Sequence, residues 1–145
     1  MITILEYPHL KLYWYDDDRT ILVGDIERGW TWDNAHAGLR TLNETVKVWA
    51  ESRKVYVILH FHEGAQSPPK GESSIANMRQ VLTDDPNYET LTIIVAQSNV
   101  VGSLIKIASR MYQVTHNHSK YRYVSTFDHA LKIITDHKTT KRQTS

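Results

Sequence analysis

The chain has 145 residues, a formal net charge of +1 and no cysteine. This length is typical of a single domain, and a hydrophobic content of 41% is that of a globular protein. The lack of cysteine excludes disulfides, thiolate metal sites and cysteine nucleophiles. No apolar segment is long enough to span a bilayer, and the N-terminal residues do not form a signal-peptide pattern. We therefore expect a cytoplasmic protein.

The first part of the chain predicts a β-hairpin. In the segment 10–15, Leu12 and Trp14 alternate with other side chains, which is the period of two expected for a strand. The aspartates at 16–18 favour a turn, because their side chains bond to nearby backbone. A second strand is predicted at 20–26.

A change of period after the hairpin predicts a long helix. Apolar side chains recur every three or four residues along 32–49, which is the spacing of an amphipathic helix. Thr31 precedes this pattern and is suited to cap the helix N-terminus. We expect the helix to pack on a sheet through Leu39, Leu42 and Val46.

The remaining chain alternates apolar runs, typical of strands, with helical patterns. Strands are predicted at 54–62, 91–96 and 121–124. Each is followed by a predicted helix, at 72–83, 99–112 and 126–136. The predicted fold class is α/β, with a mixed, mostly parallel five-stranded sheet and about four helices in the order β-β-α-β-α-β-α-β-α. The segment 2–6 is a candidate for a further short strand, but Pro8 separates it from the hairpin, and it is not included in this order. Residues 1–136 are expected to form one domain, and 137–145 a basic flexible tail.

This order resembles the STAS fold of anti-sigma-factor antagonists such as SpoIIAA, especially the small SpoIIAA-like proteins of bacteria. The likeness is carried by 12–49, by the strand VYVILHF and by the terminal YRYVSTFDHALKII. It implies a non-catalytic regulatory module that binds a protein partner or a second copy of itself. Phosphorylatable members carry an Asp-Ser-Ser-Gly-type motif after the central strand. Here Ser73 and Ser74 lack the preceding Asp and the following Gly, so helix capping is favoured over phosphorylation.

The loop 63–74 is the longest connection predicted at the carboxyl ends of the parallel strands, where open α/β sheets place their sites. Pro68 and Pro69 stiffen it and reduce the entropy lost on binding. An insertion that merely connects two elements explains the loop equally well. Its candidate partner-binding residues are Glu63, Gln66, Ser67, Lys70, Ser73 and Ser74.

Two histidines raise the possibility of a metal site. His60 and His62 alternate on a predicted strand, so their side chains face the same side of the sheet. A catalytic zinc site has three protein ligands, and the third would come from His116 or His118 in the loop before the last strand. A metal-dependent enzyme using His60 and His62 is therefore an alternative function, although structural histidines are the simpler explanation.

Aromatic residues provide a further alternative. If Tyr13, Tyr15, Tyr56, His60 and His62 share a sheet face that no helix covers, that face would suit a homodimer, a protein partner or a lipid-like ligand. A small-molecule or lipid carrier would also need an internal apolar cavity. The low net charge argues against nucleic acid, and no nucleotide-binding or hydrolase motif is present. The favoured function is therefore non-enzymatic protein binding, without a cofactor.

Overall fold

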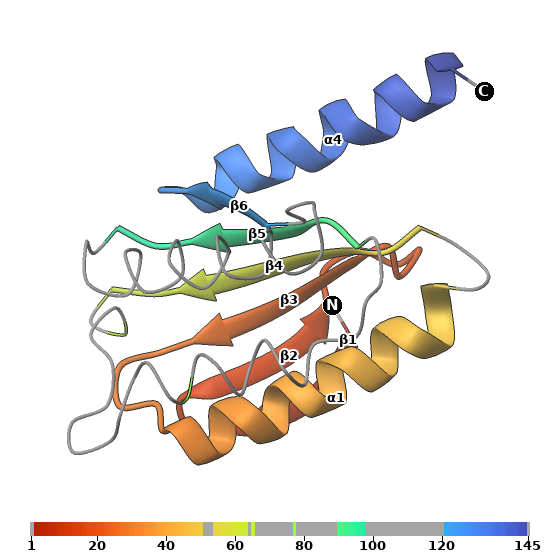
Figure 1. The fold of residues 1–145 in the computed structure, drawn as a ribbon. Coiled ribbons are helices and arrows are strands. Elements are labelled where there is room, and N and C mark those ends of the chain that lie inside the picture. The colour runs from red at the N-terminus through yellow and green to blue at the C-terminus, as the bar shows by residue number, and fades with distance from the viewer. Residues whose placement is uncertain are drawn as a thin grey trace.

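The computed structural model describes residues 2–50, 54–63, 65, 77, 90–97 and 121–144. Within them, six strands form one sheet with a helix on each face (Figure 1). The strands are β1 (Ile2–Tyr7), β2 (Leu10–Trp14), β3 (Ile21–Ile26), β4 (Tyr56–Phe61), β5 (Thr92–Val95) and β6 (Tyr121–Val124). The helices are α1 (Trp32–Ala50) and α4 (Phe127–Thr144).

The strands lie in the sheet in their chain order, from β1 to β6. The pairs β1–β2 and β2–β3 are antiparallel, whereas β3–β4, β4–β5 and β5–β6 are parallel. The predicted fold class, including its STAS order, is therefore wrong. The sheet has six strands in an antiparallel and a parallel part, and the described residues contain two helices rather than about four. Of the helices predicted at 72–83 and 99–112, only Asn77 lies within the described residues, and it has helical backbone conformation.

The additional strand is β1, which Pro8 does not prevent. Pro8 occupies the tight turn between β1 and β2, where no ladder hydrogen bond is required of its nitrogen. His9 completes the turn with a φ of 66°, and its carbonyl accepts a hydrogen bond from the Glu27 backbone N–H at 2.9 Å. Pro8 therefore ends β1 and allows β2 to pair with β1.

One face of the sheet packs against α1. Leu42 and Val46 of the helix lie in one core cluster with Leu12, Trp14 and Leu22, which are all buried. Leu39 is partly buried against the same cluster. The packing predicted for this helix is therefore confirmed. The Thr31 hydroxyl accepts a hydrogen bond from the Asn34 N–H at 3.2 Å, which also confirms the predicted cap.

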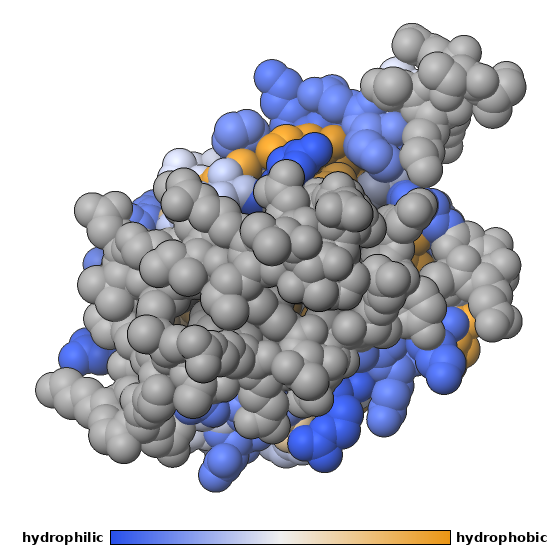
Figure 2. Space-filling view, in the orientation of Figure 1, coloured by the Kyte–Doolittle hydropathy of each residue, from blue (hydrophilic) through white to orange (hydrophobic). Residues whose placement is uncertain are grey.

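The opposite face packs against α4. Successive side chains of a strand point to opposite faces. The strand residues that alternate with those facing α1 therefore pack against α4. Ala130 and Ile134 of this helix share a core cluster with Val23, Ile58 and Ile93. Figure 2 shows hydrophilic residues over the outward-facing side of α4, the last helix of the chain. None of the helices in the described part is long and apolar enough to cross a membrane.

Side chains near the end of α4 fix it to the sheet. The Tyr56 hydroxyl lies 2.9 Å from His137 Nδ1, and the Lys138 ammonium donates a hydrogen bond to the Thr20 hydroxyl at 2.8 Å. Residues 137–144, predicted as a flexible tail, continue this helix in the structure. Phe127, at the other end of α4, therefore lies over the carboxyl ends of the parallel strands.

Candidate metal site

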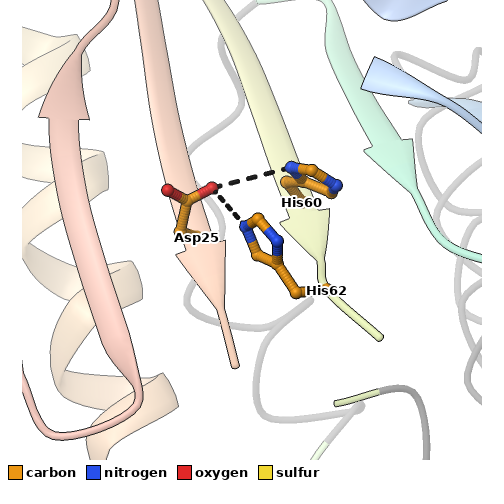
Figure 3. A group of neighbouring side chains, drawn as sticks. All are labelled: Asp25, His60 and His62. Atoms are coloured by element: carbon orange, nitrogen blue, oxygen red, sulfur yellow. Dashed lines mark hydrogen bonds and ion pairs between the residues drawn. The ribbon is translucent and has the colours of Figure 1, made fainter. Parts of the chain in front are cut away.

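Asp25, His60 and His62 converge on the face of the sheet that α4 covers (Figure 3). The parallel register of β3 and β4 places Asp25 directly opposite His60. His62 follows β4 immediately and returns to the same side as His60 because the side-chain period is two. The three side chains therefore meet at the carboxyl ends of two adjacent parallel strands, the usual place for sites in open α/β sheets.

One carboxylate oxygen faces both imidazoles. Asp25 Oδ1 lies 2.9 Å from His62 Nε2 and 3.7 Å from His60 Nδ1. One ligand atom from each of the three residues lies within 4.8 Å of the other two. The side chains of Asp25, His60 and His62 are 19%, 22% and 39% exposed. The cluster is therefore sheltered on the sheet side and open to solvent beside His62.

The surroundings of His60 favour its neutral form. Burial lowers the pKa of His60 below the ordinary value of 6.5, His62 lowers it further, and the Asp25 carboxylate acts in the opposite direction. The ring of His60 lies between two others, with centroid distances of 3.9 Å to His62 and 5.3 Å to Phe127. Neutral imidazole is the form that coordinates metals, so His60 is kept in the form that a metal ion requires.

Tyr13 of β2 lies on the same sheet face as Asp25, two residues along from the cross-strand partner of that aspartate. Burial, together with the nearby Asp25 charge, raises the pKa of Tyr13 to about 12. The Tyr13 hydroxyl therefore stays protonated at neutral pH. Lys11, the cross-strand partner of Asp25, holds its ammonium 5.6 Å from the centre of the Tyr13 ring.

The sequence predicts part of this cluster. His60 and His62 face the same side, as their spacing predicts, but Asp25 was not among the predicted ligands. Its signal is an acidic residue in the otherwise apolar run ILVGDI. That signal does not show which strand lies beside it. The predicted third ligands, His116 and His118, lie outside the described residues.

The other predicted site residues are mostly not described. Glu63 is exposed in the turn after β4 and does not belong to the cluster. Protein binding by the loop 63–74 stays a prediction, because its other candidates lie outside the described residues: Gln66, Ser67, Lys70, Ser73 and Ser74. Capping by Ser73 and Ser74 also stays a prediction.

The tyrosines predicted to share a sheet face with the histidines do share it, but α4 covers that face. Tyr13 and Tyr56 are 7% and 1% exposed and belong to the core cluster that includes α4 residues. Tyr15 is 41% exposed and packs on Phe127 of the same helix. The aromatic surface proposed for a dimer or a lipid-like ligand is thus largely occupied by α4.

No protein-family model matches the chain, and neither a curated protein nor a solved structure matches it significantly. The resemblance to SpoIIAA-like proteins therefore stays a prediction from the sequence. The chemistry of the site has to be inferred from its own residues.

Proposed function

We propose that this domain binds a divalent transition-metal ion through Asp25, His60 and His62. The observation that supports this most directly is the convergence of two imidazoles and one carboxylate from adjacent strands within 4.8 Å. Nitrogen and oxygen ligands of this kind suit zinc, iron, cobalt and nickel. Two histidines with one carboxylate also form a common catalytic ligand set.

The observed spacing is close to what such an ion needs. Zinc–nitrogen and zinc–oxygen bonds of about 2.0–2.2 Å place neighbouring ligand atoms roughly 3–3.5 Å apart. Asp25 Oδ1 is already 2.9 Å and 3.7 Å from the two histidine nitrogens. Small side-chain rotations would therefore complete the site, with the ion replacing the proton shared between Asp25 and His62.

Three protein ligands leave coordination positions for water or a substrate, as in catalytic rather than structural zinc sites. The exposure of His62 provides access from solvent. The metal-dependent enzyme considered from the sequence is therefore the functional class that this site supports, with Asp25 as its third ligand. In the described residues, no comparable observation favours the protein-binding module or the carrier.

The proposal is tested by titrating the metal-free full-length protein with Zn²⁺ in a calorimeter. We expect one ion per chain, and a loss of affinity of at least about a hundredfold in each of Asp25→Asn, His60→Ala and His62→Ala, since even outer-shell changes cost 10–100-fold. His137→Gln is the matched control, because His137 bonds Tyr56 near the other end of α4. Its affinity should equal that of the wild type.

Two results would overturn the proposal. The first is a wild-type protein that takes up no ion. The second is a triple variant of the three ligands that binds Zn²⁺ as tightly as the wild type, because the other histidines would then account for the uptake.

A further inference from the structure

We propose that Phe127 is a positioning residue that holds the His60 imidazole in the orientation needed to coordinate the metal ion. This inference rests on the proposed function, and it assigns a role to a residue that is itself no ligand. The observation behind it is the stacking of the two rings, whose planes differ by 30° and whose centroids lie 5.3 Å apart. A functional side chain keeps its geometry when packing restricts its own rotamers.

The His60 ring depends on such a contact. The terminal torsion of histidine is broad, and rotation about it would carry Nδ1 away from Asp25 Oδ1, which lies 3.7 Å from it. Most metal-binding histidines are oriented by a hydrogen bond from their other ring nitrogen. Within the described part of the chain, the His60 imidazole forms no such bond. The rings of Phe127 and His62, which stack on it, restrict its rotation instead.

The fold holds Phe127 firmly enough to orient another ring. Phe127 is the first residue of α4, and the Thr126 hydroxyl caps this helix by accepting a hydrogen bond from the His129 N–H at 3.2 Å. The Phe127 ring packs against the core cluster between α4 and the sheet, and its centroid lies 5.5 Å from that of Tyr15. A packed helix therefore presents this ring, and helices position site residues more precisely than loops do.

The test titrates the metal-free protein with Co²⁺, whose visible absorption reports the number and geometry of its ligands. A pH of about 8, well above the ordinary histidine pKa, prevents a change in the titration of His60 from altering the affinity. We expect Phe127→Ala to bind Co²⁺ about 2–10-fold more weakly, which is the cost of ordering one further side chain, and to alter the absorption band. Phe127→Leu, which is apolar but has no flat ring, should do the same. Phe127→Tyr keeps the ring and should retain the wild-type affinity and spectrum.

Ile134→Val is the matched control for a loosened helix. Ile134 is 1% exposed and packs α4 onto the sheet through the same core cluster. It lies about 10 Å along the helix from Phe127. Its replacement should lower the stability of the domain without changing the affinity for Co²⁺ or the absorption band.

The outcomes separate this inference from the proposed function. If the wild type binds Co²⁺ and Phe127→Ala shows the same affinity and spectrum, Phe127 does not position His60, while the metal site stands. Equal weakening in Phe127→Ala and Ile134→Val would likewise overturn the inference, since it would reflect a general loosening of α4. Binding by Phe127→Tyr that is as weak as in Phe127→Ala would also overturn it, because the ring is then present without effect. If the wild type binds no Co²⁺, both fail.

Discussion

Replacement of Phe127 by alanine should change both the stability of the domain and the titration of His60. Phe127 is the first residue of α4, and its ring contacts Tyr15 and His60 with centroid distances of 5.5 Å and 5.3 Å. An aromatic pair contributes about 0.5–1.5 kcal/mol beyond the burial of its area. Loss of both pairs should therefore lower the free energy of unfolding by roughly 1–3 kcal/mol.

The same substitution should raise the pKa of His60. Burial is the largest cause of its lowered pKa, and removal of the Phe127 ring opens one side of the imidazole to water. The pKa of His60 is lower in the folded state than the ordinary 6.5, so protonation of His60 destabilises the folded state. The free energy of unfolding should therefore rise with pH until the pH exceeds 6.5. This contribution should be smaller in Phe127→Ala.

The assay combines chemical unfolding over a range of pH with NMR titration of the imidazole resonances in the metal-free protein. Phe127→Leu is the control, because leucine keeps an apolar cover over His60 without a ring and should raise the pKa less. An unchanged or lower pKa for His60 in Phe127→Ala, with an unfolding free energy within about 0.5 kcal/mol of the wild type, would refute the role given to this ring.

Two further predictions concern the fold. A Cβ atom at Gly38 would lie 2.8 Å from Leu10 Cδ2, so Gly38→Ala should destabilise the protein by about 1–2 kcal/mol in denaturant unfolding, despite the better helix propensity of alanine. In a Leu10→Ala background, the same change should stabilise it. Burial raises the pKa of Asp16, but hydrogen bonds from Thr20 and Ile21 lower it by more, to below the ordinary 3.8. Asp16→Ala should therefore cost about 1 kcal/mol at neutral pH, and this difference should shrink as the pH falls through the pKa of the folded state; a difference independent of pH would contradict it.

The sequence predicts those helices and strands that depend on patterns among residues close together in the chain. The helix α1 and its packing through Leu42 and Val46 follow from a clear period of 3.6 residues. The strands β4 and β5 follow from apolar runs bounded by polar segments. The predicted order leaves out β1, because Pro8 separates the candidate strand 2–6 from the hairpin, although a proline in a tight turn is compatible with pairing on both sides.

The candidate site shows a different limit. The period of two places His60 and His62 on one side, and this needs no knowledge of the neighbouring strands. Asp25 joins them only through the parallel register of β3 and β4, which pairs residues 35 positions apart in the chain. Register of this kind depends on tertiary packing, whereas the sequence alone points to His116 or His118 in a loop as the third ligand.

The most direct test of the central claim is X-ray absorption at the zinc edge, measured on the protein loaded with one Zn²⁺ per chain. We expect two imidazole nitrogens and at least one oxygen at about 2.0–2.2 Å from the ion, and the loss of one imidazole in His62→Ala. A zinc shell made of oxygen alone, or one that His62→Ala leaves unchanged, would contradict the assignment of Asp25, His60 and His62 as the ligands.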